Sequence, residues 1–344
     1  MNSLRDQWTK LLKELALRHG FMGVGISRAE FMTEEATNLE AWLGKGYHGE
    51  MGYMANHFDK RVDPTKLVPG AKSVISLMYN YFPLPLNPLN VTFSPINEMR
   101  LRTHNSQLMK DESETAEAIQ PESDSFKISR YAYGEDYHKV VRKKLKALVA
   151  ELREEIGDFH ARVFVDSAPV LERDWAKRSG QGWVGKNTLL IHPKKGSYFF
   201  LAEIILDVEF DYDHPIRDHC GTCTRCIDAC PTDAISPEGY VLDGSKCISY
   251  LTIELKSNIP ETFHGQMQDW IFGCDICQEV CPWNRFAMPH EESAFKIKDK
   301  LHGMKNEEWT ELTEEIFDEL FSKSPLKRAG YEKLKNTIGI INKS

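Results

Sequence analysis

The sequence predicts an α+β protein in three parts: an N-terminal α/β domain, a cysteine-rich domain and a short α-helical C-terminal region. Two observations carry this prediction. Strand-like apolar segments alternate with helical segments in the N-terminal half, which implies a sheet covered by helices. All eight cysteines lie in one later segment, from Cys220 to Cys281. We therefore expect the three parts over residues 1–210, 211–290 and 291–344.

The N-terminal domain is expected to contain long helices and several buried strands. Apolar spacing predicts helices over residues 3–19 and 136–156, and apolar runs predict strands over residues 21–26, 73–78, 161–165 and 197–206. Residues 84–126 are rich in Pro, Asn, Ser, Glu and Gln, which predicts a flexible insertion.

The C-terminal region shows helical spacing of apolar residues from about residue 306, and a second helix is expected over residues 329–341. The apolar positions of the first helix are Trp309, Leu312, Ile316, Phe317, Leu320 and Phe321.

Composition restricts the class of protein. The chain has 344 residues, of which 41% are hydrophobic, and no apolar stretch approaches the roughly 20 residues that a membrane span needs. The N-terminus reads as an amphipathic helix and not as a signal peptide, so we expect a cytoplasmic protein without membrane association, and a monomer by default. The formal charge of −8 argues against a protein that coats nucleic acid indiscriminately.

The first four cysteines follow the spacing of bacterial ferredoxins, Cys220-x2-Cys223-x2-Cys226-x3-Cys230-Pro. In that pattern three thiolates bind one [4Fe–4S] cluster and the fourth binds another. The short spacings allow one loop to wrap three corners of a cluster. The sequence therefore predicts a bacterial-ferredoxin-like domain with two clusters that transfer single electrons.

The remaining four cysteines complete the second cluster. A gap of 26 residues separates Cys247 from a Cys274-x2-Cys277-x3-Cys281-Pro run. The crossed pattern assigns each proline-flanked cysteine to the opposite cluster. The predicted ligands are Cys220, Cys223, Cys226 and Cys281 for the first cluster, and Cys230, Cys247, Cys274 and Cys277 for the second.

Two other uses of the cysteines are less consistent with the sequence. A disulfide framework is typical of small secreted chains, and this chain is larger and shows no export signal. Zinc binds CxxC pairs, but the repeated CxxxCP ending is not a zinc-knuckle spacing.

Residues 163–187 suggest a substrate in addition to electron transfer. Asp166 stands at the end of a predicted strand, where open α/β sheets expose ligands, although a turn or helix cap explains such an aspartate equally simply. His48, His57, His138 and His192 fit no ligand pattern and are expected to be structural or surface residues.

The chain resembles the epoxyqueuosine reductases, cobalamin-dependent iron–sulfur enzymes that perform the last step of queuosine formation in tRNA. The resemblance rests on motifs spread along the chain: HGEMGYM at 48–54, RVDP at 61–64, PGAKSVISL at 69–77, SRYAYGEDYHKVVRKKL at 129–145, DSAPVLERDWAKRSGQGWVGKNTLLI at 166–191, CGTCTRCIDACPTDAI at 220–235, KCISYLTIE at 246–254 and GCDICQEVCPWN at 273–284.

The resemblance implies a mechanism in which cobalamin in the N-terminal domain is reduced through the clusters and drives removal of the epoxide oxygen. It makes Asp166 the proton donor, and a carboxyl group close to a hydrophobic corrin is expected to have a raised pKa. It also implies cobalamin contacts at Arg61, Arg130, Asp166, Asn187, Ser249 and Asp275.

The implied partners are a tRNA that carries epoxyqueuosine in its anticodon loop and an unidentified low-potential electron donor. The target nucleotide turns out of the stacked loop to reach cobalt. The residues expected next to the RNA are Ile253, Glu254, Leu255 and Lys256.

Two other functions remain open at this point. A reductive dehalogenase-like enzyme shares cobalamin and two clusters but typically carries a twin-arginine export signal. A plain ferredoxin-type electron carrier needs neither residues 163–187 nor the long segment before the cysteines.

Overall fold

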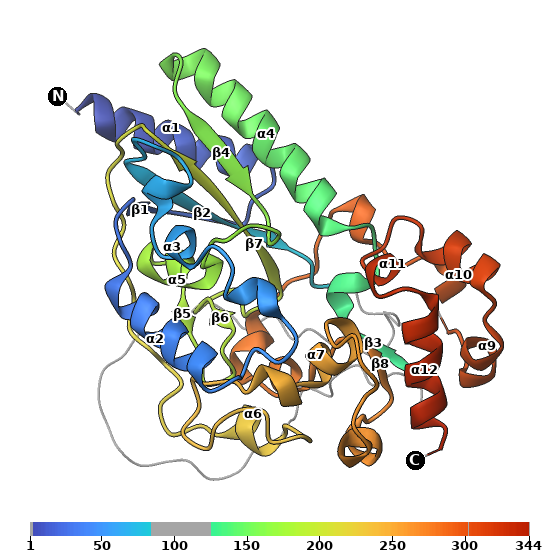
Figure 1. Cartoon of the computed structure of the whole chain (residues 1–344). Coiled ribbons are helices and arrows are strands. Elements are labelled where there is room, and N and C mark those ends of the chain that lie inside the picture. Colours follow the sequence, from blue (N-terminus) through green and yellow to red (C-terminus); the bar gives the residue numbers. More distant parts are fainter. Residues whose placement is uncertain (1–2, 84–124, 302, 344) are drawn as a thin grey trace, which may run out of the picture.

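The centre of the protein is a four-stranded sheet (Figure 1). The computed structural model describes residues 3–83, 125–301 and 303–343. The strand order is β1-β2-β7-β4, with bounds β1 (Gly23–Arg28), β2 (Ser73–Asn80), β4 (Ala161–Phe164) and β7 (Phe199–Leu206). Each of the four expected strands overlaps one of these.

Every pairing in this sheet is antiparallel. The domain is therefore not built from parallel βαβ units, and the expected α/β description is wrong in this respect. The rule that places ligands at the carboxyl ends of parallel strands does not apply here, although Asp166 does follow β4 closely.

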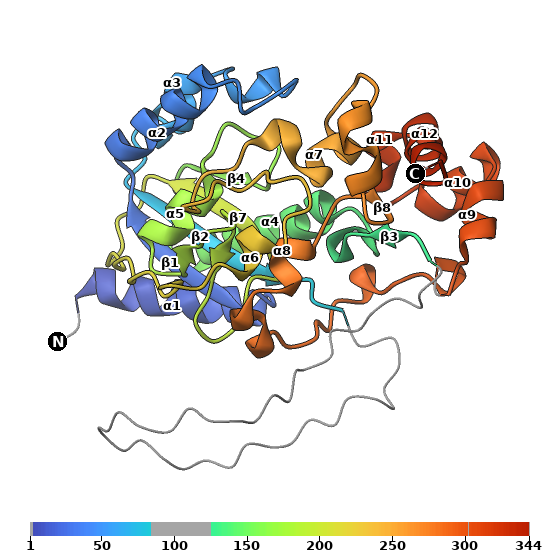
Figure 2. The ribbon, with the colours of Figure 1, turned by 90° about the horizontal axis from the view of Figure 1, so that it is seen from below.

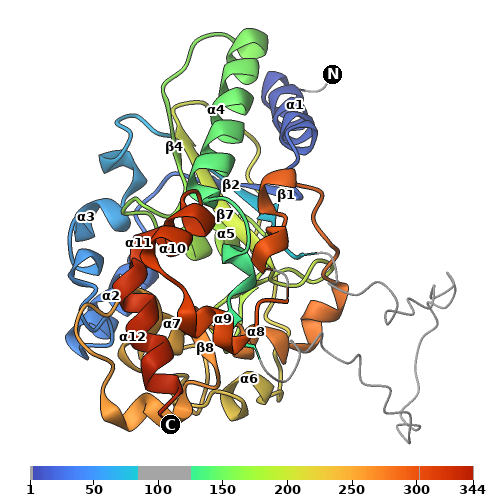
Figure 3. The same cartoon turned by 90° about the vertical axis from the view of Figure 1, so that its right-hand side faces the viewer.

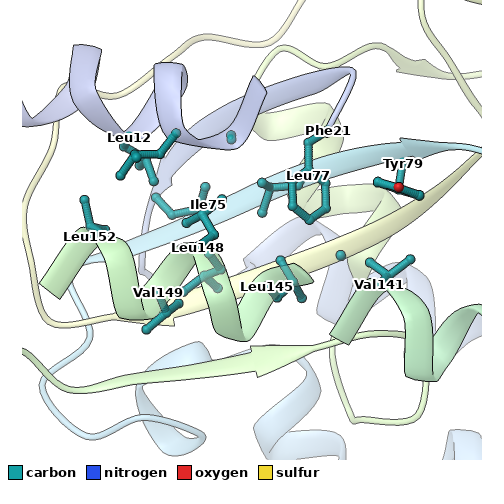
Figure 4. Packing of buried hydrophobic residues seen from close by; sticks show 14 of the residues in the cluster. Leu12, Phe21, Ile75, Leu77, Tyr79, Val141, Leu145, Leu148, Val149 and Leu152 are labelled. Carbon is teal, nitrogen blue, oxygen red and sulfur yellow. The ribbon is translucent and has the colours of Figure 1, made fainter. Parts of the chain in front are cut away.

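One face of the sheet packs against two long helices, α1 (Leu4–Arg18) and α4 (Tyr137–Ile156). Alternate residues of β2 and β7 point to this face and meet the apolar stripe of α4, as Figure 4 shows for Ile75, Leu77, Leu145 and Leu148. Both helices begin at side-chain caps, since Ser3 accepts from the backbone of Asp6 and Asp136 accepts from that of His138.

The opposite face packs against α5 (Glu172–Arg178) and the segment that carries α2 (Thr33–Gly44) and α3 (Phe58–Arg61). A side chain at Gly25 of β1 would lie 2.3 Å from the carbonyl oxygen of Ser179, which shows how closely the end of α5 approaches the sheet. Two polar residues, Ser76 and Glu203, interrupt the apolar side chains of this face and are opposite one another on β2 and β7.

The cysteine-rich part follows the sheet and is built from short elements (Figure 2). Its helices α6 and α8 contact each other, and a parallel pair of strands, β3 and β8, ties residues 127–128 to it. The bounds of the elements in this part are α6 (Arg225–Asp228), α7 (Ile248–Ile253), α8 (Ile276–Glu279) and β8 (Trp270–Phe272). Three short strands come earlier in the chain: β3 (Lys127–Ile128), β5 (Trp183–Val184) and β6 (Leu190–Ile191).

The C-terminal helices form a group beside β8 and α7 (Figure 3). The expected helix from residue 306 is divided into two, and the expected second helix is preceded by a short turn of helix. Their bounds are α9 (Asn306–Glu311), α10 (Glu314–Phe321), α11 (Leu326–Ala329) and α12 (Tyr331–Ile341). Phe126 and Ile128 share a core with these helices, so the C-terminal region is packed against earlier parts of the chain.

The expected insertion at 84–126 lies outside the described residues except for its last two positions. Within the described ranges, no helix is both long and apolar enough to cross a membrane.

Candidate active site

Asp166 lies in a tight turn directly after β4. Its φ of +56° is in the left-handed region, which a non-glycine residue adopts only when its surroundings hold it there. The carboxylate is 56% exposed. Its Oδ2 atom accepts a hydrogen bond from the Tyr137 hydroxyl at 2.7 Å and contacts His138 Nε2 at 3.0 Å. The turn therefore presents a solvent-reachable carboxylate that two side chains of α4 hold in place.

His138 connects Asp166 to a second carboxylate. Its Nδ1 atom is 2.7 Å from Asp136 Oδ1, so a carboxylate flanks each ring nitrogen. Arg328 of the C-terminal region reaches the same group, with Nη1 3.1 Å from His138 Nε2 and Nη2 3.3 Å from Asp136 Oδ2. His138 is buried. Its expected structural role is therefore incomplete, because it contacts the candidate catalytic carboxylate directly.

The electrostatics of this group favour charged forms. Burial alone lowers the pKa of His138, but its hydrogen bonds to Asp136 and Asp166 outweigh burial and raise that pKa. Burial acts to raise the pKa of Asp166, yet the hydrogen bonds from His138 and Tyr137 bring it below its ordinary value. The expectation of a raised Asp166 pKa beside a corrin stays a prediction; within the chain itself, donors on α4 act in the opposite direction.

A second polar group lies behind the same turn. The backbone N–H of Asp166 donates to Glu172 Oε1 at 2.6 Å. The carboxyl group of Glu172 is in hydrogen-bond contact with that of Glu203. Glu203 is fully buried at the middle of β7. Burial, together with the neighbouring carboxylates, raises the pKa of Glu172 to about 8 and that of Glu203 as well.

Tyr53 and Glu254 border the exposed side of Asp166. Tyr53 is 48% exposed. Burial and the charges of Glu254 and Asp166 raise its pKa to about 12. Arg61 is buried and donates to the backbone carbonyls of Asn56 and Tyr53, the latter at 2.7 Å. Its guanidinium therefore shapes the loop that carries Tyr53.

Arg130 and Asp275 are brought together from distant parts of the sequence. The backbone N–H of Arg130 donates to Asp275 Oδ2 at 2.8 Å, and its guanidinium contacts both Asp275 and Glu279. The charges of Asp166 and Asp275 both act on the phenol of Tyr131 and help to raise its pKa, after burial. Predicted site residues from the turn after β4 and from the second cysteine run thus both lie within electrostatic reach of one partly buried tyrosine.

Asn187 and Ser249 lie beside the cysteines. Asn187 is buried, and its Nδ2 donates to the carbonyl of Cys277 at 3.2 Å. Ser249 is half-buried in α7, two residues after Cys247. Both residues are therefore placed between the candidate cluster sites and the sheet domain.

The first predicted set of cysteines lines a single cavity of about 220 Å³, which Asn187 and Trp283 also line. Trp183 Nε1 points to the sulfur of Cys220 at 3.4 Å. None of the eight cysteines forms a disulfide. In the described part of the chain, no three His, Cys, Asp or Glu side chains converge on one metal-ion position. The thiols are instead spread around a space larger than one ion. The four thiols that line this cavity belong to Cys220, Cys223, Cys226 and Cys281.

The second predicted set is also brought together, but deeper in the protein. Cys247 and Cys274 pack against the same apolar cluster, and the thiol of Cys277 is within electrostatic reach of Cys247 and Cys230. Burial raises the pKa of Cys247, Cys274 and Cys277. Thiolates in such surroundings need a bound metal to compensate their charge.

The four residues expected next to RNA differ in exposure. Lys256 is exposed, and its backbone N–H donates to Glu50 Oε2 at 2.7 Å. Ile253 and Glu254 are half-buried. The side chain of Leu255 is buried in an apolar cluster, and its carbonyl accepts from Lys333, so it can act on a ligand only through its neighbours.

Comparisons with known proteins agree with this arrangement. Residues 61–167 match the family described as "Epoxyqueuosine reductase QueG, DUF1730", and residues 219–284 match the "4Fe-4S double cluster binding domain". The epoxyqueuosine reductase of Leadbetterella byssophila is 52% identical over 98% of this chain and 99% of its own. This chain belongs to the epoxyqueuosine reductase family. The Escherichia coli member is 37% identical over 97% of this chain and 80% of its own.

Solved structures of the family share the fold. An epoxyqueuosine reductase crystallised with an epoxyqueuosine-modified tRNA stem loop has a TM-score of 0.79 and 27% identity, covering 97% of this chain and 80% of that one. The Bacillus subtilis enzyme, with the same TM-score and identity over 97% and 81%, is described with its catalytic aspartate loop swung out of the active site. The predicted family and double-cluster domain are thus confirmed.

Sequence reasoning missed five polar residues around Asp166. Tyr53, Tyr137 and His138 lie inside motifs that carried the resemblance, and Glu172 follows Asp166 by six positions. Glu203 had a signal of its own, because it is a single acid within the apolar run FFLAEIIL. A lone carboxyl group in a buried strand is unfavourable unless it has a partner.

Proposed function

We propose that this protein reduces epoxyqueuosine to queuosine in tRNA, with cobalamin and two [4Fe–4S] clusters as cofactors. The observation that carries the proposal is the 52% identity to an epoxyqueuosine reductase over almost the whole of both chains. Removal of an epoxide oxygen as water requires two electrons and two protons; the Asp166 turn supplies one of these protons and solvent the other.

The clusters are bound by the two cysteine sets in the crossed pattern. The 220 Å³ cavity that four of these cysteines line supports the first set. The electrostatic contact of the Cys277 thiol with Cys247 and Cys230, and the raised pKa of Cys247, Cys274 and Cys277, support the second. The Nδ2 contact of Asn187 with the Cys277 carbonyl places a polar side chain of the sheet domain beside the buried set.

Cobalamin would be held between the sheet domain and the buried cysteine set. Asp166 and Ser249 border this region, while Arg61, Arg130, Asn187 and Asp275 shape it through hydrogen bonds within the chain. The convergence of Asp166 and Asp275 on Tyr131 supports this location. When bound, reduced cobalamin supplies the electron pair that cleaves the carbon–oxygen bond.

The chain itself supplies a proton. The proton is held by His138, between Asp136 and Asp166, because hydrogen bonds raise the pKa of His138 and lower that of Asp166. It passes from Nε2 to Asp166 Oδ2 and from there to the departing oxygen. Asp166 thus acts as general acid, and His138 restores its proton. Exposure of the carboxylate allows the substrate to reach it.

The RNA approaches from the side that Tyr53 and Glu254 border. Tyr53 offers an exposed aromatic ring for a base turned out of its loop, and Lys256 offers a cation for phosphate. This arrangement requires a low-potential electron donor and is consistent with a monomer working in the cytoplasm, where its tRNA substrate is found.

The test is single turnover by the anaerobically reconstituted protein. Protein with iron, sulfide and cobalamin is chemically reduced and mixed with an epoxyqueuosine-bearing stem loop, and nucleosides are analysed by mass spectrometry. We expect the modified nucleoside to lose one oxygen atom. Clusters that are reduced while the nucleoside stays unchanged would overturn the proposal and favour an electron carrier.

A further inference from the structure

The buried carboxyl group of Glu203 has no donor to accept from. Its relative exposure is 0%, and neither of its oxygens has a hydrogen-bond partner among the described residues when both it and Glu172 are treated as acceptors. The hydroxyl of Ser76, directly across from it on β2, is likewise buried and unpartnered. The group that Glu203 does meet is the carboxyl of Glu172.

Two carboxyl groups in contact cannot both be ionised in such a place. Among the described residues, His138 is the cation whose charge acts on the pair, and it acts on Glu172. The charged groups that act on the pair are Asp166, which opposes further negative charge, and the more distant His138. A proton between the two groups removes the conflict, because one carboxyl then becomes a donor and the other accepts from it.

The pair is connected to the active site by one short hydrogen bond. Glu172 Oε1 accepts from the backbone N–H of Asp166 at 2.6 Å. This bond fixes the residue whose φ is +56°, a conformation that persists in a non-glycine residue only where other contacts hold it. Glu203 is anchored on β7 between β2 and β4, in register with Ser76 and Phe164. The central strand of the sheet is thus linked through two side chains to the turn.

We propose that Glu203 and Glu172 share a proton and act as positioning residues that hold the Asp166 turn in its active conformation. The importance of this pair for catalysis rests on the proposed role of Asp166, whereas its structural link to the turn does not. Glu203, carrying the proton, donates to Glu172, and Glu172 accepts from Glu203 and from Asp166. Removal of the shared proton at alkaline pH places two like charges in contact, drives Glu172 from its position and releases the turn.

The experiment follows backbone hydrogen exchange of residues 164–171 in the anaerobic holoprotein from pH 6 to 9, corrected for the chemical exchange rate. In the wild type we expect protection that weakens on the alkaline side. Glu203→Gln keeps a donor without a titrating proton, so protection should persist across this range. Glu203→Leu removes the donor and should increase exchange about tenfold at every pH.

Controls separate a local effect from general unfolding and from failure of the proposed function. Glu292→Gln changes another partly buried glutamate, one that pairs with Lys144 and Tyr79, and should leave exchange of residues 164–171 unchanged. Iron content and melting temperature show whether each variant is folded. Glu203→Gln with wild-type alkaline loosening, or Glu203→Leu with wild-type protection, would overturn the proposal. Because exchange needs no turnover, a result here stands even for protein that leaves tRNA unchanged.

Discussion

The carboxylate of Asp166 contacts one polar group on α4, while its backbone N–H contacts another inside the sheet. The first group contains Asp136, His138 and Arg328, so its carboxylates meet cations. The second contains only the carboxyl groups of Glu172 and Glu203. Hydrogen bonds from His138 outweigh burial and bring the pKa of Asp136 and Asp166 below its ordinary value, whereas burial and neighbouring carboxylates raise the pKa of Glu172 and Glu203.

This difference shows that carboxyl groups serve two purposes around the Asp166 turn, proton transfer and anchoring of the backbone. A carboxylate paired with a protonated histidine can donate a proton to a substrate and then be reprotonated by the histidine, as general-acid catalysis requires. A protonated carboxyl pair deep in the sheet exchanges protons reluctantly, which suits anchoring. The predictions below test each side, beginning with the largest expected effect.

Asp166→Asn should reduce single-turnover removal of the epoxide oxygen by about 10²- to 10⁴-fold, because the amide cannot act as general acid. Iron content should stay close to that of the wild type. The matched control is Asp207→Asn, which changes the aspartate directly after β7, beside the start of β4 and so at the other end of these strands from Asp166. A variant that retains wild-type turnover would remove Asp166 from this role.

His138→Gln should reduce turnover by about 10- to 100-fold, less than the loss of Asp166, because solvent can still protonate the 56% exposed carboxylate slowly. The wild-type rate should fall as pH rises through the raised pKa of His138, and the variant should lose this dependence. His192→Gln is the control, since burial lowers the pKa of His192 to about 4 and leaves it neutral. Equal pH profiles for wild type and His138→Gln would contradict the proposal that His138 supplies the proton to Asp166.

Glu172 should make stability depend on pH in the direction opposite to a paired carboxylate. Its pKa rises from 4.5 to about 8, so across this window the folded protein holds a proton that the unfolded chain releases. The free energy of unfolding therefore falls as pH increases, by at most about 1.4 kcal/mol per pH unit for one proton. The measurement is the melting temperature of wild type and of Glu172→Gln, taken anaerobically from pH 5 to 8. The melting temperature of the wild type should fall more steeply with rising pH than that of the variant. Identical slopes would show that the pair binds no such proton.

Arg328→Gln should have the smallest effect, below about threefold in turnover, because the side chain is 53% exposed and such pairs contribute little. Its charge lowers the pKa of His138, so its removal should move the alkaline limb of the rate profile to higher pH. Lys327→Gln, next to it but paired with Asp318, is the control. A limb that moves to lower pH would contradict the assigned electrostatics.

Features of the fold and of the site could be predicted from the sequence where the residues that determine them are close together in the chain. Cysteine spacing and apolar runs were enough for the cluster domain and the four strands, because those patterns act over a few residues. The antiparallel order was not predictable, since β2 pairs with β7 across more than a hundred residues. Asp166 could be singled out from its position after a strand and from the resemblance.

The protonation partners of Asp166 could not be found in the same way. His138 precedes Asp166 by 28 residues, Arg328 follows it by 162, and Glu203 lies on another strand. Only the fold places them around one turn, and only that arrangement reveals a pKa for Asp166 below its ordinary value. The lone Glu203 within an apolar strand was the one sequence signal for the anchoring pair.

The measurement that tests this account most directly is a neutron crystal structure of the fully deuterated holoprotein at neutral pD. We predict deuterium on both ring nitrogens of His138, none on the Asp166 carboxylate, and one deuterium between Glu203 and Glu172. A singly deuterated His138 ring beside a deuterated Asp166, or a Glu203–Glu172 pair without deuterium, would contradict the opposite protonation states on which the account depends.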